Sequence, residues 1–93
     1  MILVDTLMTY AYYGGQLRSW CHMATDNLQD DGLAELHEMA AKLGLERKHF
    51  QPDPRVPHYD LVVSKQAEVV KLGARLVTRR ELLKRCERKR TRR

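Results

Sequence analysis

Short apolar runs and alternating apolar and polar residues along the chain predict four strands. They are residues 2–4, 17–25, 58–63 and 74–77. The first run is continuously apolar, which suits a strand buried on both faces. The second run alternates, which places Trp20 and His22 on the face opposite Cys21. In the third run, alternation places His58 and Asp60 together on one face.

Three stretches have the apolar spacing and end signals of amphipathic helices. They are residues 33–43, residues 65–72 and a third helix that begins after Thr78. Gly44 and Gly73 follow the first two helices, in the position where glycine commonly ends a helix. Ser64 is the expected N-cap of the second helix, and Thr78 with Glu81 forms a capping box for the third.

The order of these elements predicts the fold class. Short strands that alternate with helices favour an α/β fold, here one small domain of about four short, mainly parallel strands covered by three helices. Residues 7–16 and 45–57 are expected to be connections, and three prolines interrupt the second of them. The domain is expected to span residues 1–85, with residues 86–93 as a basic helix end or tail. A core of this size is modest, and a homodimer would supplement it.

Length and composition exclude several classes of protein. The 93-residue chain has no apolar stretch near the roughly twenty residues of a membrane span. The start, MILVDT, lacks the basic leader of a signal peptide. Cys21 and Cys86 are far apart in sequence and form no compact thiol motif, so we expect reduced thiols and a cytoplasmic location.

Basic charge is concentrated in the last third of the chain. Residues 1–61 contain nine acidic and five basic side chains, whereas residues 62–93 contain three acidic and twelve basic ones. This asymmetry favours an anionic partner, nucleic acid or nucleotide, over a plain solvated helix end. The standard nucleic-acid motifs are absent, so binding is expected to be directed at the phosphate backbone. The candidate contacts are Arg79, Arg80, Lys84, Arg85, Arg88, Lys89, Arg90, Arg92 and Arg93.

Polar residues that carry chemistry gather in two segments, Trp20 to His37 and Pro57 to Asp60. Asp5 follows the first strand, and the carboxyl ends of strands in open α/β sheets are where ligands gather. The expected ligand-binding residues are Asp5, Trp20, His22, Asp26, His37, His58, Tyr59 and Asp60.

The same residues support a metal site as an alternative. Imidazole and carboxylate groups suit zinc, manganese or iron, with His22, His37 and His58 as candidate ligands. The candidate catalytic residues are His22, Asp26, His37 and His58, which would hold a metal-bound water for hydrolysis of a phosphodiester. The other interpretation is a hydrogen-bonded core in which each histidine fixes a loop. Cys21 and His22 point to opposite faces of a strand and cannot form a nucleophilic pair with each other.

Four motifs in this order carry a resemblance to a known family. They are WCHMATD, AELHEMAAKLGL, PHYDLV and GARLVTRREL. The chain resembles, over roughly residues 1–85, a family of small bacterial and phage proteins catalogued as domain of unknown function 4031. The residues that match its pattern are Trp20, His22, Asp26, Glu35, Leu36, His37, His58, Tyr59 and Asp60. The resemblance implies the fold above and no particular activity.

Together these patterns predict a small basic protein that binds a phosphate-bearing partner through a His/Asp pocket and a basic C-terminal helix. The alternatives are a metal-dependent hydrolase or nuclease that uses the same cluster, and a phage-type inhibitor of a host protein without chemistry of its own.

Overall fold

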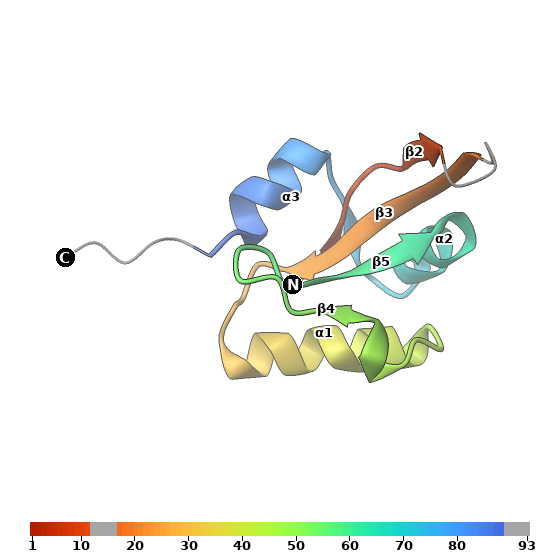
Figure 1. The fold of residues 1–93 in the computed structure, drawn as a ribbon. Helices are drawn as coiled ribbons and strands as arrows, with labels where there is room; N and C mark the ends of the chain where they lie inside the picture. The colour runs from red at the N-terminus through yellow and green to blue at the C-terminus, as the bar shows by residue number, and fades with distance from the viewer. Residues whose placement is uncertain (12–16, 89–93) are drawn as a thin grey trace.

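A computed structural model describes residues 1–11 and 17–88. In this part of the chain, a six-stranded mixed sheet carries helices on both faces (Figure 1). The strands are β1 (Ile2–Val4), β2 (Met8–Ala11), β3 (Leu17–Thr25), β4 (Phe50–Gln51), β5 (His58–Val62) and β6 (Arg75–Leu76). The helices are α1 (Asp30–Lys42), α2 (Val63–Lys71) and α3 (Arg79–Cys86), with a 3₁₀ helix at Arg47–His49. The small α/β domain with three helices is as predicted.

Neighbouring strands run mostly antiparallel, so the prediction of a mainly parallel sheet is wrong. The strand order is β4-β5-β3-β1-β6, β2 pairs with β3, and among these pairs only β1 with β6 is parallel. Helical crossovers do join parallel strands, since α1 leads from β3 to β4 and α2 leads from β5 to β6. Each crossover skips at least one strand of opposite direction, however, so the hydrogen-bonded neighbours are antiparallel.

Two strands lie in segments predicted to be connections. β2 pairs with the first half of β3, and β1 pairs with the second half of β3 along the same edge. β4 has only two residues, Phe50 and Gln51, and pairs with the start of β5. Both strands are too short to show a clear period in the sequence, and both form by adding to a longer strand.

The core has two parts because β-strand side chains alternate between the two faces. On one face the sheet packs against α1 and α2. The buried residues there are Ile2, Val4, Cys21, Met23, Leu36, Ala40, Leu43, Tyr59, Leu61, Val69 and Ala74. On the other face, Leu3, Ala24 and Val56 pack against Leu82 and Cys86 of α3, which lies across the sheet from α1 in Figure 1. The predicted alternation of β3 and β5 is confirmed.

Several helix ends follow the predicted signals. Gly44 and Gly73 come directly after the C-caps of α1 and α2 and have φ of 80° and 111°, a conformation that favours glycine. The Thr78 hydroxyl accepts a hydrogen bond of 3.1 Å from the Glu81 backbone N–H at the start of α3. The predicted capping box is formed only by half, because the Glu81 carboxylate accepts a hydrogen bond of 2.8 Å from Arg85 Nε and no bond from the Thr78 backbone is seen in the described residues.

Ser64 is not an N-cap, so that prediction is wrong. α2 begins at Val63, directly after β5, and Val62 occupies the cap position without a side-chain hydrogen bond. The strand thus turns straight into the helix, which leaves no loop for a capping residue. Among the described helices, none is both long enough and apolar enough to cross a membrane.

Candidate functional site

Three of the predicted ligand-binding residues lie together on the α3 face of the sheet. His22 of β3 is the register partner of Asp60 on β5, and His58 lies two residues before Asp60 on the same face. Nε2 of His58 lies 3.5 Å from Oδ1 of Asp60, and Nε2 of His22 lies 4.0 Å from the same oxygen. The centroids of the two imidazole rings are 5.0 Å apart. We call these three residues the His/Asp cluster.

Both imidazole rings are held by their other nitrogen. Nδ1 of His22 lies 2.9 Å from Oδ2 of Asp5, and Nδ1 of His58 lies 2.7 Å from the carbonyl oxygen of Val56. These oxygens only accept hydrogen bonds, so each Nδ1 carries the proton. In the neutral rings, each Nε2 therefore has a free lone pair on the side of Asp60.

Asp5 is fixed behind His22 by hydrogen bonds of its side chain and of its backbone. Its side chain is fully buried, and Oδ1 accepts a 2.6 Å hydrogen bond from the His22 backbone N–H in addition to the contact of Oδ2 with the ring. Its own N–H donates to the His22 carbonyl, and its carbonyl accepts from Nε2 of Gln66 on α2. Asp5 was predicted to line the site, and the structure places it where it orients a lining residue.

The His58–Asp60 contact shifts the pKa of both groups. In the protonated ring, Nε2 of His58 donates a hydrogen bond to Asp60, and this bond raises the pKa of His58 above its usual value, although burial opposes this. The same contact lowers the pKa of Asp60, whose side chain is 42% exposed. The carboxylate is therefore ionised at neutral pH and available to a cation.

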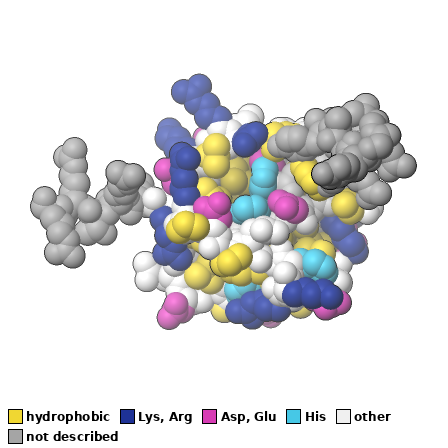
Figure 2. Space-filling model, viewed as in Figure 1, with side chains coloured by type: hydrophobic (Ala, Val, Ile, Leu, Met, Phe, Trp, Pro, Cys, Tyr) yellow, Lys and Arg dark blue, Asp and Glu magenta, His cyan; other side chains and the backbone are white. Residues whose placement is uncertain are grey.

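Arg55 and Arg79 line a pocket next to the His/Asp cluster. His22 and His58 line a pocket of about 170 Å³ between the sheet and α3. Its other lining residues are Asp53, Arg55, Val56, Arg79, Leu82 and Leu83. Figure 2 shows histidine next to acidic side chains near the centre of the view, with basic side chains over α3. Sequence reasoning missed Arg55, because it lies in a connection interrupted by prolines, where no regular period indicates the direction of a side chain.

His37 does not join the other two histidines. It lies on α1, on the opposite face of the sheet, where its Nδ1 is 2.7 Å from the Tyr59 hydroxyl and its ring packs edge-on against Phe50. Because strand side chains alternate, Tyr59 points away from its neighbours His58 and Asp60. The set of His22, His37 and His58 predicted as metal ligands is therefore not assembled, and Asp60 occupies the third place.

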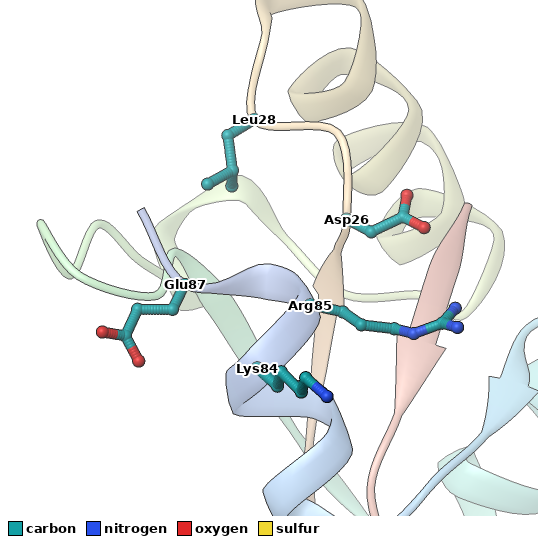
Figure 3. Close-up of a pocket in the computed structure, with 5 residues that line it drawn as sticks. All are labelled: Asp26, Leu28, Lys84, Arg85 and Glu87. Carbon is teal, nitrogen blue, oxygen red and sulfur yellow. The ribbon is translucent and has the colours of Figure 1, made fainter. Parts of the chain in front are cut away.

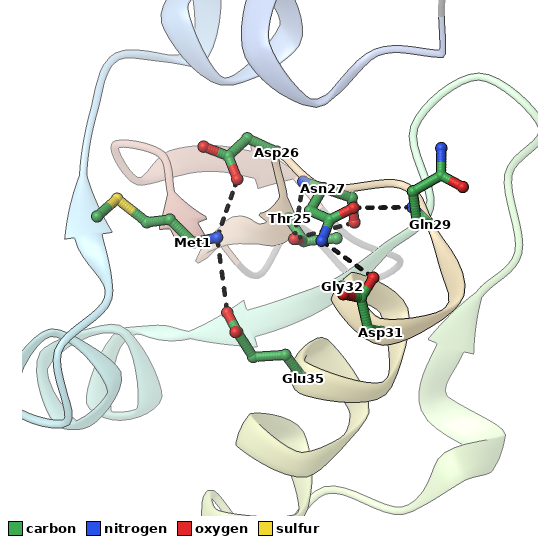
Figure 4. Close-up of polar contacts among 8 residues, drawn as sticks. All are labelled: Met1, Thr25, Asp26, Asn27, Gln29, Asp31, Gly32 and Glu35. Carbon is green, nitrogen blue, oxygen red and sulfur yellow. Dashed lines mark hydrogen bonds and ion pairs between the residues drawn. The ribbon is translucent and has the colours of Figure 1, made fainter.

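Asp26 also lies apart from the His/Asp cluster. It follows the end of β3, where its carboxylate is 2.9 Å from the Met1 amino nitrogen (Figure 4). It lines a separate pocket of about 430 Å³ with Leu28, Lys84, Arg85 and Glu87. In Figure 3, Asp26 and Arg85 extend to one side of this pocket and Glu87 to the other. The mixed charges that line this pocket favour no single class of ligand.

The basic residues of α3 are exposed to solvent, and two of them are held by neighbours. Arg79, Arg80, Lys84 and Arg85 have exposed side chains, as does Arg88 after the end of α3. Arg79 Nη1 donates to Sδ of Met8 at 2.9 Å, and Arg85 pairs with Glu81. The predicted contacts Lys89, Arg90, Arg92 and Arg93 lie outside the described residues.

The His/Asp cluster has the donors of a transition-metal site. The two imidazole nitrogens and one carboxylate oxygen lie within 4.8 Å of one another, which is close enough for one ion to bridge them after small side-chain movements. This donor set suits zinc, manganese or iron. Three protein ligands leave coordination positions for water or an anion.

Comparison with known proteins supports the resemblance found in the sequence. No curated protein and no solved structure matches the chain. The model of one family, described as "Protein of unknown function (DUF4031)", matches residues 2–89. That match spans nearly all of the sequence, and the chain therefore belongs to the DUF4031 family.

Proposed function

We propose that this protein binds a phosphate-bearing partner, nucleic acid or nucleotide, through a divalent metal ion held by His22, His58 and Asp60. The observation that carries the proposal is the convergence of two Nε2 atoms on one carboxylate while each Nδ1 is held by an acceptor. Acceptors on Nδ1 of this kind fix the tautomer and orientation of histidines that bind metals through Nε2.

The charges around the cluster favour phosphate as the further ligand. A bound divalent ion would offset the Asp60 carboxylate and leave positive charge facing the pocket. Arg79 borders the same pocket, and a guanidinium group can donate two hydrogen bonds to one phosphate group. α3, which lines this pocket through Arg79, Leu82 and Leu83, also carries further exposed basic residues, and a polyanion long enough to reach them would gain further contacts.

The second candidate function is hydrolysis of a phosphodiester by the same site. It is favoured because the described residues supply three ligands at the cluster, which leaves a position for a metal-bound water. This activity would make the protein a metal-dependent nuclease or phosphodiesterase.

We also propose a cytoplasmic location, because Cys21 and Cys86 are free thiols buried on opposite faces of the sheet.

The first test is metal binding by purified protein, measured by elemental analysis and by calorimetric titration with Zn²⁺ and Mn²⁺. We expect one ion per chain in the wild type and none in His22→Ala or His58→Ala. The matched control is His37→Ala, which removes a histidine outside the cluster and should keep the ion. Equal metal content in all four proteins would contradict the site.

The second test is binding of a fluorescent oligonucleotide, followed by anisotropy with the metal-loaded protein and again after chelation. The proposal expects chelation and His58→Ala each to weaken binding. Cleavage of the oligonucleotide that depends on the metal would establish the hydrolase. Failure of the metal-loaded protein to bind the oligonucleotide, nucleotides or inorganic phosphate would contradict the proposed function.

A further inference from the structure

The pocket beside the His/Asp cluster is small, and it ends on the core. Its volume is about 170 Å³, whereas pockets that enclose a drug-sized ligand measure about 300–1,000 Å³. Val56 and Leu82 line the pocket, and both belong to the buried cluster that packs under α3. The pocket therefore suits a phosphate group rather than a whole nucleotide, and it is closed on the side of the core.

The loop that forms one wall of this pocket is tied to the end of α3. Oδ1 of Asp53 accepts hydrogen bonds from the backbone N–H groups of Arg55 and Val56, at 2.7 and 3.2 Å. The Arg55 carbonyl accepts a bond of 2.8 Å from the Arg88 N–H. The Arg55 side chain pairs with Glu87, at 3.1 Å. These contacts fix the loop against α3, so the pocket is held at its small size.

Of the two arginines in the pocket, Arg79 is the one without an acidic partner among the described residues. Its Nη1 donates to Sδ of Met8, and the edge formed by Nε and Nη2 has no contact in the described part of the chain. Two N–H groups on one edge of a guanidinium match two oxygens of one phosphate. The pocket thus combines a place for one metal ion with a donor for two oxygens.

A phosphate needs three free oxygens to use the metal ion and the edge of Arg79 together. A phosphate monoester has three such oxygens and a charge of about −1.5 to −2 at pH 7. A phosphate inside a strand has two free oxygens and a single charge, because its other two oxygens continue the chain. Such a strand would also have to leave the pocket in two directions, and the core closes one of them.

We infer that the site takes a terminal phosphate, the phosphate monoester of a nucleotide or of the end of a nucleic-acid strand. This inference rests on the proposed function and narrows its ligand class. The sugar and base stay outside the small pocket, so they contribute little to the selection. Trp20, which was predicted to bind a ligand, is on the strand face of His22 but is not among the residues that line this pocket.

The experiment compares two pairs of ligands on the metal-loaded protein by calorimetric titration. The first pair is thymidine 5′-monophosphate and its methyl ester, which differ at one phosphate oxygen. The second pair is an eight-nucleotide oligothymidylate with a phosphate at both ends and the same strand with none. We expect the monoester of a pair to bind about 10–100-fold more tightly, because its counterpart loses a hydrogen bond to a charged group. A preference in the first pair alone identifies a free nucleotide as the ligand, and one in the second pair identifies a strand end.

Variants of two arginines test the contribution of Arg79. Arg79→Lys keeps the charge but not the paired donors, so it should lose most of the preference for the monoester. Arg47→Gln is the matched control, because Arg47 lines the pocket of His37 on the opposite face, and it should keep the preference. Equal affinity of the wild type within both pairs overturns the inference and leaves phosphate binding intact, and this comparison needs no variant to fold. Binding of none of the four ligands overturns the proposed function and the inference with it.

Discussion

The carboxylate of Asp5 contacts His22 at two points. One oxygen lies 2.6 Å from the backbone nitrogen of His22, and the other lies 2.9 Å from Nδ1 of the His22 ring. Asp5→Asn keeps the shape but offers an amide N–H in place of one acceptor oxygen. We expect metal affinity to fall about 10–100-fold, because the ring loses the partner that fixes its tautomer. Calorimetric titration with Zn²⁺ measures this change.

Asp26→Asn is the matched control for this variant, because it replaces a carboxylate that lies outside the His/Asp cluster. Its metal affinity should equal that of the wild type. If Asp5→Asn also binds metal like the wild type, Asp5 has no role in orienting His22. The free energy of unfolding should drop by about 1–3 kcal/mol in Asp5→Asn, since a buried hydrogen bond is removed.

Gly32 in the first turn of α1 should not tolerate a side chain. A Cβ atom there would clash with the carbonyl oxygen of Asn27, whose loop folds over the helix start (Figure 4). Gly32→Ala should therefore destabilise the fold by about 1–3 kcal/mol, although alanine has the higher helix propensity. Urea denaturation tests this, with Glu38→Ala on the exposed side of α1 as a near-neutral control. A Gly32→Ala protein more stable than the wild type would show that the loop moves aside without cost.

Both cysteines should be inert in the folded protein. Burial raises the pKa of the Cys21 thiol and of the Cys86 thiol to about 12, so almost no thiolate is present at pH 8. A colorimetric thiol reagent should label neither thiol in native protein at pH 8 and both after denaturation. Rapid labelling of one thiol without denaturant would reveal local opening of its face of the sheet.

His37 should make stability depend on pH. Burial first, and then the charge of Arg47, lower the pKa of His37 below its usual value of 6.5. The unfolded chain therefore binds the proton at higher pH than the folded one. The stability that His37 contributes is fully present above pH 6.5, and it is lost as the pH falls through the folded pKa.

The measurement is the melting temperature of the wild type and of His37→Gln between pH 5 and pH 8. The difference between the two proteins should be largest near pH 8 and should shrink as the pH falls. A difference that stays constant over this range would show that His37 does not titrate with folding.

The basic end of the chain should steepen the salt dependence of nucleic-acid binding. Cys86 is buried against the sheet, and the Arg88 backbone N–H donates to the Arg55 carbonyl, so a deletion that spares these contacts begins after Arg88. Removing residues 89–93 takes away four basic side chains. The slope of log affinity against log salt should become shallower, by about 0.7 for each phosphate of a single strand that the shortened protein no longer neutralises. An unchanged slope in an anisotropy titration would exclude the tail from binding.

Local features of this fold were predictable because they depend on residues close together in the sequence. The alternation in β3 placed Cys21 and Met23 on one face, and the glycines at 44 and 73 ended two helices as expected. The order of strands was not predictable in this way. It depends on which strands each helix skips, and that is decided by packing of the whole sheet rather than by any local period.

The site was predictable only in part for the same reason. His22, His58 and Asp60 each had a readable strand position, but their meeting depends on the register between β3 and β5. In the sequence His37 looked equivalent to His22 and His58, because each of the three belongs to one of the motifs that carry the family resemblance. Because His37 lies on α1, it lies on the same face of the sheet as Tyr59. Nothing in the sequence of α1 indicates which face of the sheet this helix covers.

Asp5 lies between β1 and β2, and it also affects the register in which the strands of the sheet pair. Asp5 is fully buried, and its carboxylate contacts both the backbone and the ring of a residue seventeen positions away. If β3 slipped by one residue, His22 would move to the opposite face, and Asp5 would be left buried beside a thiol or a methionine. A buried carboxylate without a partner is costly, so the residues that form the site also select the correct alignment of the strands.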